Sequence, residues 1–192
     1  MLQHAASAPR RSKGEMVQTW DERVAAVWAD DSLTDDERIV LIDAIAAERA
    51  GDDPRALFER AGARDAAGLE RDAEPLYRAA IAAGLSGAEL PQAVIQLAST
   101  LRNLGRVEEA IDLLRPEYER GAAGALPDEV AAFYALALVS AGQPDAAASV
   151  ALTALAPHLT RYRRSVEAYA REVTEPHDLP TANTSGSSEP RR

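Results

Sequence analysis

The side chains best suited to catalysis are few, and their spacing matches no catalytic or metal-binding motif. The chain has no cysteine and three histidines, at His4, His158 and His177. It contains no paired-histidine metal motif, no phosphate-binding glycine loop and no nucleophile elbow. The acidic run at residues 35–37 falls in a predicted first helical turn, where the helix dipole favours carboxylates. We therefore expect no catalytic residue, no metal site and no cofactor, and we predict that the chain is not an enzyme.

The charge of the chain argues against nucleic acid as a partner. The 192 residues carry a net charge of −10, and the segment 17–60 alone has twelve Asp and Glu against five Arg. Such a surface repels a phosphate backbone, whereas nucleic-acid-binding proteins usually present a basic face. Solubility is the simpler explanation for this acidity.

Composition also favours a cytoplasmic protein from a bacterium. No apolar run reaches the roughly 18 residues of a membrane span, and the first residues contain no apolar signal core. We therefore expect no membrane partner and a cytoplasmic location. Of the 21 basic residues 20 are arginine, and alanine is abundant, which is typical of a GC-rich bacterial genome.

A fixed period of 37 residues organises the middle of the chain. It separates Gly68, Gly105 and Gly142, and it recurs in two series of alanines: Ala61, Ala98, Ala135 and Ala73, Ala110, Ala147. A constant period between 20 and 50 residues is the signature of a solenoid, in which each repeat stacks on its neighbours. The pattern within each period is helical, so the sequence predicts an all-α solenoid.

Each repeat is expected to be a pair of antiparallel helices that reverse direction at the periodic glycine. Glycine adopts the left-handed conformation of such a turn without strain. The periodic alanines let the helix axes approach closely. The predicted pairs span 54–84, 91–120 and 127–157, within three 37-residue repeats at 54–158. Pro116 is expected to kink or end its helix early, because it removes an amide donor.

The flanking segments are expected to differ from the repeats. We predict a disordered N-terminus at 1–15, a degenerate helix pair at 16–53, a capping helix at 159–175 and a disordered tail at 176–192. Within the degenerate pair, Thr34 and Glu37 form a predicted capping box for a helix that runs to about Ala50. Trp20 and Trp28 lie on an apolar stripe of the preceding helix.

These features resemble the tetratricopeptide repeat, and more loosely its bacterial group-five form. The resemblance is clearest in QLASTLRNLGRVEEAIDLL, residues 96–114, where large, small and glycine positions follow the order of the family. The period of 37 exceeds the usual 34 of the family, consistent with longer loops between repeats. The resemblance implies a right-handed α-solenoid closed by the C-terminal helix. Arg60 and Arg64 depart from it, because they replace large apolar residues, and we expect that face of the helix to be partly open.

The resemblance also implies a binding surface, since the first helix of each pair lines a concave groove that binds peptides in this family. The expected partner-binding residues are Arg55, Phe58, Gln92, Ile95, Gln96, Ser99, Arg102, Asn103 and Phe133. Phe58 and Phe133 have a second interpretation as core residues. The lysine and asparagine clamp for chaperone tails is not expected. The equivalent key positions hold neither residue: Phe58, Gly62, Ile95, Ser99, Ala132 and Leu136.

The resulting hypothesis is a protein- or peptide-binding scaffold or adaptor of unknown partner. The alternative is a self-associating structural protein, a possible homodimer, which would join through the Trp20 and Trp28 stripe or through the terminal helix. The arginine cluster at 161–164 could bind an acidic segment of another copy, although a solvated helix face is the simpler interpretation.

Overall fold

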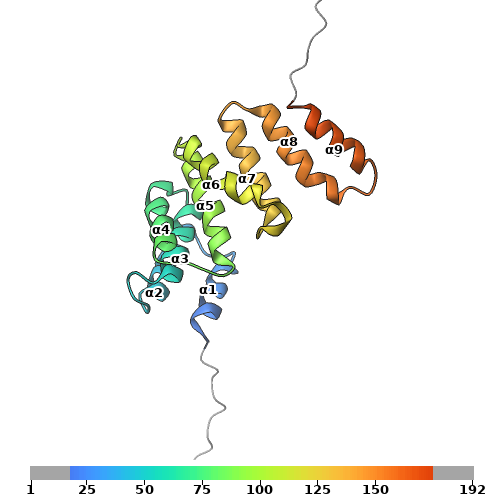
Figure 1. Cartoon of the computed structure of the whole chain (residues 1–192). Coiled ribbons are helices and arrows are strands. Elements are labelled where there is room, and N and C mark those ends of the chain that lie inside the picture. Colours follow the sequence, from blue (N-terminus) through green and yellow to red (C-terminus); the bar gives the residue numbers. More distant parts are fainter. Residues whose placement is uncertain (1–17, 175–192) are drawn as a thin grey trace, which may run out of the picture. The chain divides into compact units, whose positions relative to one another are not determined.

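The computed structural model describes residues 18–174, and this part of the chain contains nine α-helices and no strand. The helices are α1 (Trp20–Trp28), α2 (Asp35–Ala46), α3 (Pro54–Ala66), α4 (Glu70–Ala82), α5 (Glu89–Asn103), α6 (Val107–Glu119), α7 (Pro127–Ser140), α8 (Pro144–Leu155) and α9 (Arg163–Glu172) (Figure 1). Short 3₁₀ turns lie at Gly121–Ala123 and Ala156–His158. The all-α prediction is confirmed. The predictions for 1–15 and 176–192 fall outside the described residues.

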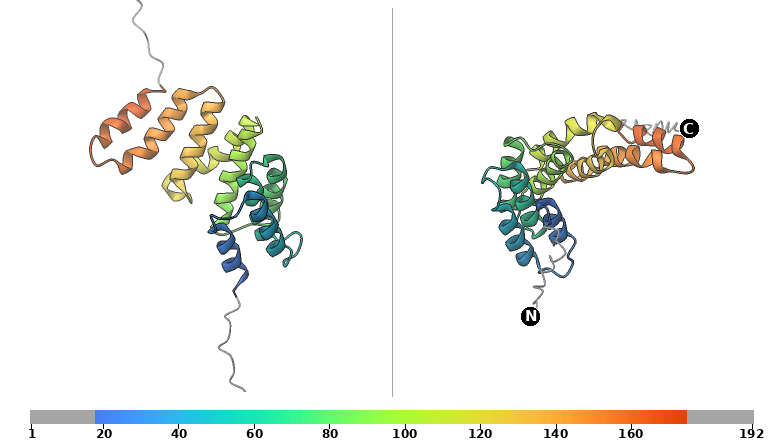
Figure 2. Two further views of the ribbon diagram at one scale, coloured as in Figure 1. Left: turned by 180° about the vertical axis from the view of Figure 1, so that it is seen from behind. Right: turned by 90° about the horizontal axis from the view of Figure 1, so that it is seen from below.

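The described residues form two compact units, which divide between Thr100 and Leu101 inside α5. In the first unit α3 packs against α2 and α4. In the second, α7 packs against α6 and α8, and α8 also contacts α9. Both views of Figure 2 show α8 and α9 side by side.

The periodic glycines form the same turn three times. Gly68, Gly105 and Gly142 have φ angles of 70°, 79° and 75°. In each turn the amide after the glycine donates to the carbonyl five residues before it, at 2.9 Å. This bond is one half of the Schellman motif, which satisfies carbonyls at a helix end. The predicted helix reversals are confirmed, and all six periodic alanines are buried.

Three helix ends differ from the prediction. The helix expected to reach about Ala50 ends at Ala46, and the second pair begins at Glu89, two residues early. The early helix end expected at Pro116 is also wrong, because α6 continues through it to Glu119. Proline removes a single backbone bond here, and the last turn is held by Tyr118, whose ring lies 5.2 Å from that of Tyr134.

The tryptophan stripe lies inside the first unit. Trp20 and Trp28 pack against a buried cluster of Val24, Ile42 and Ala63. The Trp20 indole N–H donates to the Ile45 carbonyl at 2.9 Å. The predicted Thr34–Glu37 capping box is present, and Thr19 with Glu22 forms a second one at α1. Both tryptophans are half-buried and pack within their own chain, so the stripe gives no support to self-association by this route.

Candidate partner-binding surface

Two of the expected binding residues belong to the core. Phe58 is buried and packs on Tyr77, with 6.2 Å between the ring centroids, and Ile95 is also buried. Phe58 was interpreted either as a groove residue or as a core residue, and its burial shows that it is a core residue. A buried side chain offers a partner little surface, so both residues leave the candidate set.

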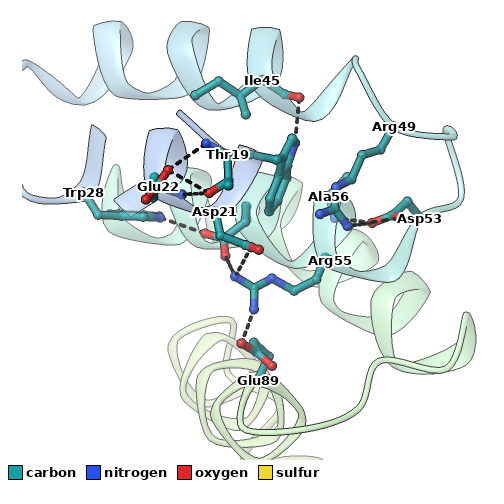
Figure 3. Close-up of polar contacts among 12 residues, drawn as sticks. Thr19, Asp21, Glu22, Trp28, Ile45, Arg49, Asp53, Arg55, Ala56 and Glu89 are labelled. Carbon is teal, nitrogen blue, oxygen red and sulfur yellow. Dashed lines mark hydrogen bonds and ion pairs between the residues drawn. The ribbon is translucent and has the colours of Figure 1, made fainter. Parts of the chain in front are cut away.

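Arg55 is occupied by three carboxylates of its own chain (Figure 3). Its guanidinium lies 3.4 Å from Asp21 in α1 and 3.2 Å from Glu59 in α3, and it also pairs with Glu89 at the start of α5. Asp21, Arg55 and Glu89 are spaced 34 residues apart, once in each direction. In the 37-residue period the α5 position equivalent to Arg55 is Gln92, so Glu89 lies three residues before it, at the start of α5. Arg55 joins these helices within the first unit, which leaves it poorly placed to bind a partner.

Glu59 is the buried member of this group. Its carboxylate accepts a hydrogen bond from the Trp28 indole at 2.7 Å and pairs with Arg55. Burial raises the pKa of Glu59, and this outweighs the lowering effect of Trp28 and Arg55. Nearby Glu89 and Asp21 add to the rise in pKa. The geometry supplies one cation for three anions, so Glu59 is only partly neutralised.

A second polar contact joins α3 to α5. Asp65 lies 2.9 Å from the Thr100 hydroxyl and 3.4 Å from the Tyr77 hydroxyl. Burial raises the pKa of Asp65, although these hydrogen bonds oppose it, and burial also raises the pKa of Tyr77. Thr100 is completely buried. Buried polar groups of this kind fix the positions of helices more than they offer reactive chemistry.

The expected residues that keep some exposure lie mainly on α5. Gln92 and Asn103 are exposed, and Gln96, Ser99 and Arg102 are half-buried. Positions 92, 96, 99 and 103 fall on one side of a helix. The Gln92 amide donates to the Ala88 carbonyl at 3.1 Å, and Arg102 donates to Asn103 at 3.0 Å. The Gln96 side-chain oxygen is buried without a hydrogen-bond partner among the described residues. This side of α5 can donate and accept hydrogen bonds.

Helix α7 carries an apolar surface that sequence reasoning did not select as a whole. Phe133 is half-buried, but Leu136 and Val139 are 46% and 55% exposed. The opposite side of α7 is core, with Val130, Tyr134 and Leu138 buried. The signal was present in the sequence, because residues 130–139 are apolar around the whole helix. Helices α6 and α8 pack against α7 but leave Leu136 and Val139 exposed, whereas a helix that is apolar all round is usually buried.

A cavity of about 440 Å³ lies between α2, the loop after it, and α3. Asp43 lines it and accepts hydrogen bonds from Arg60 at 3.0 Å and Arg64 at 2.8 Å. Burial alone would raise the pKa of Asp43, but the two arginines lower it. The face of Arg60 and Arg64 that was expected to be partly open is therefore bridged by α2. The two arginines replace apolar packing with ion pairs.

Within residues 18–174, no group of three or more His, Cys, Asp or Glu side chains could hold a metal ion. In the same residues, no helix combines the length and apolar character that crossing a membrane requires.

The fold defines a helical-repeat protein whose exposed surfaces are suited to binding. A family model described as "Tetratrico peptide repeat" matches residues 54–173, from α3 to the end of α9. No curated protein and no solved structure matches the chain. The family match covers more than half of the chain, which therefore belongs to the tetratricopeptide repeat family. Repeats of this type generally mediate protein–protein interactions, and the family is typically a non-enzymatic scaffold.

Proposed function

We propose that the chain is a protein- or peptide-binding scaffold or adaptor with two separate candidate contact surfaces, the polar side of α5 and the exposed apolar side of α7. The observation that carries this proposal is the exposed apolar side of α7. Leu136 and Val139 stand on a helix whose other side is core, so their exposure is not explained by the fold. Full burial of such a side chain is worth about 1.5–3 kcal/mol, enough to anchor a partner.

The polar residues of α5 would orient the bound partner and make its recognition specific. The Gln96 side-chain oxygen and the Arg102 Nε are buried without a hydrogen-bond partner among the described residues, and both residues lie on α5. Amide and guanidinium groups at an interface orient a partner, and arginine is frequent among the residues that dominate binding energy. We therefore propose Gln92, Gln96, Ser99, Arg102, Asn103, Phe133, Leu136 and Val139 as contacts. The cytoplasmic location, the bacterial origin and the absence of nucleic-acid binding stay predictions from composition.

The proposal can be tested by crosslinking from defined positions. A photoreactive amino acid is placed at Gln92 or at Leu136 in the full chain, and at Arg71 or Ala151 as controls. The control residues are exposed on the second helices α4 and α8. We expect a protein to be crosslinked in cells from Gln92 and from Leu136 and not from the control positions.

The affinity of that purified partner is then measured for two variants. Gln96→Ala with Arg102→Ala, and Leu136→Ser with Val139→Ser, should each weaken binding by about tenfold or more, with an unchanged melting curve. Equal crosslinking from all four positions, or wild-type affinity in both variants, would reject the proposed surface.

A further inference from the structure

The cavity between α2 and α3 has the size and the lining of a small-molecule site. Its volume of about 440 Å³ falls within the roughly 300–1,000 Å³ of typical ligand pockets. Its apolar lining includes the buried side chains of Ala46, Ala56 and Leu57. Five of its nine lining residues are alanine or glycine, and a Cβ added to Gly51 would meet nothing within 4 Å. The protein's own side chains therefore leave this space open.

Arg60 brings a guanidinium with unused donors to the cavity. Its Nε donates to Asp43 at 3.0 Å, whereas its two Nη atoms make no hydrogen bond within residues 18–174. Asp43 does not depend on Arg60 for a counter-charge, because Arg64 donates to both of its carboxylate oxygens, at 3.0 Å and 2.8 Å. The Nη atoms of Arg60 are therefore available to an anion in the cavity.

Arg49 brings a second guanidinium to the lining, and neighbouring groups hold it in place. Its Cζ lies 3.8 Å from the centroid of the Trp20 ring, and its Nη1 lies 3.4 Å from each carboxylate oxygen of Asp53 (Figure 3). Its Nε and Nη2 make no hydrogen bond to the residues that the structure describes. A guanidinium stacked on an aromatic ring keeps its edges free to bind a carboxylate.

We propose that this cavity binds a monocarboxylate with a short aliphatic chain, its carboxylate on the two lining arginines and its chain on the apolar lining. The charges favour a single negative charge, because the carboxylates of Asp43 and Asp53 would repel a doubly charged phosphate. A free short-chain acid and the apolar C-terminal residue of a peptide both have this chemistry. The inference concerns α2 and α3 and is independent of the proposed function, which rests on α5 and α7.

Two-dimensional NMR of the full chain measures binding, with acetate, butanoate and hexanoate as probes. We expect hexanoate to bind with a Kd of about 1 mM and to shift mainly the amide signals of residues 46–51 and 56–60. Each added methylene should raise the affinity about fourfold, because it buries more apolar surface. Hexylamine has the same chain length with the opposite charge and should not shift these signals. N-acetyl-leucine carries its carboxylate as the end of a peptide does, so it distinguishes the two sources.

A pair of variants tests the role of the arginine. Arg60→Gln removes the charge, and its fold should survive because Arg64 still binds Asp43. Arg115→Gln is the matched control, because it makes the same change of charge at an exposed position on α6. Circular dichroism and melting establish that both variants fold. We expect Arg60→Gln to weaken hexanoate binding by about tenfold or more, and Arg115→Gln to bind like wild type.

The outcomes separate the two sources and the proposal itself. Binding of hexanoate supports a free acid as ligand, and binding of N-acetyl-leucine alone supports the end of a peptide. The proposal is overturned if neither compound shifts these signals at about 10 mM, tenfold above the expected Kd. Equal binding of hexylamine, or wild-type affinity in Arg60→Gln, would also overturn it. The comparison of hexanoate with hexylamine uses wild type alone, so it decides even where Arg60→Gln does not fold.

Discussion

Arg55 and Glu59 show how single residues hold the first unit together. Arg55 pairs with Asp21, Glu59 and Glu89, which come from α1, α3 and α5. Three carboxylates around one guanidinium keep an excess of negative charge near a buried group. Burial in particular raises the pKa of Glu59 above its ordinary value of 4.5. The folded state therefore binds a proton at Glu59 more readily than the unfolded state does.

This difference makes the contribution of Glu59 depend on pH. A raised folded-state pKa gives stability that is fully present below the unfolded pKa and is lost as pH rises through the folded pKa. Glu59→Gln keeps an acceptor for the Trp28 indole and never ionises. We therefore expect the melting temperature of Glu59→Gln to rise relative to that of wild type as pH increases from about 4 to about 7.

The exposed variant Glu108→Gln is the control and should show no such trend. A constant difference between Glu59→Gln and wild type across this range would mean that folding does not shift the pKa of Glu59.

The residue contacts could be predicted from sequence only where they are local. Thr34 and Glu37 are three positions apart, and their capping box follows directly from that spacing. The Arg55 contacts reach 34 residues in each direction and depend on how three helices are placed. The 37-residue period relates Arg55 to Gln92 and not to Glu89, so it did not indicate this set. The bond between Asp43 and Arg64 was missed for the same reason, since it joins separate helices.

At the scale of elements, the three glycine turns fix where each pair reverses. Gly105 has a φ of 79°, and a Cβ added to it would meet nothing within 4 Å. Any cost of a side chain there is therefore conformational strain and not a clash. We expect Gly105→Ala to destabilise the fold by about 1 kcal/mol, because alanine is strained in the left-handed region. Urea unfolding followed by circular dichroism measures this change.

Gly51 provides the matched control, because it also has open space around its Cβ position but no positive φ. Gly51→Ala should leave the stability unchanged or slightly improved. Equal effects at the two positions would show that the turn conformation does not determine the cost.

The positions of the helices could be predicted from the sequence, but it was harder to predict which side of each helix is buried and which is exposed. Each first helix can contact neighbours on more than one side, and periodicity does not tell a groove side chain from a core side chain. Phe58 illustrates this, since Tyr77 covers it from α4. Tyr162 and Tyr169 illustrate the reverse, because both lie within the predicted capping segment 159–175, yet they are 76% and 60% exposed.

At the scale of the whole molecule, we expect the two units to differ in stability. Repeat proteins gain stability from each repeat and from its nearest neighbours. Both tryptophans lie in α1 and pack in the first unit, so their fluorescence reports on that unit. Far-UV circular dichroism reports on all helices together.

The two probes should therefore report different unfolding midpoints in a variant that weakens only the second unit. Gly142→Ala strains the turn between α7 and α8 in the second unit. During guanidinium unfolding, we expect it to lower the midpoint seen by circular dichroism by more than the midpoint seen by tryptophan fluorescence. Gly68→Ala, in the first unit, should lower both midpoints. Coincident curves for Gly142→Ala would show that the chain unfolds as one cooperative body.

The near-identity of the three glycine turns also bears on how such a chain can change its length. Because Gly68, Gly105 and Gly142 have almost the same backbone geometry, a crossover between the coding segments of two turns would join one helix to an equivalent one. The product would gain or lose a whole pair of helices in steps of 37 residues, with every turn intact. Unequal recombination within the gene is therefore a short route to longer or shorter relatives, and the flanking α1, α2 and α9 would be carried along unchanged.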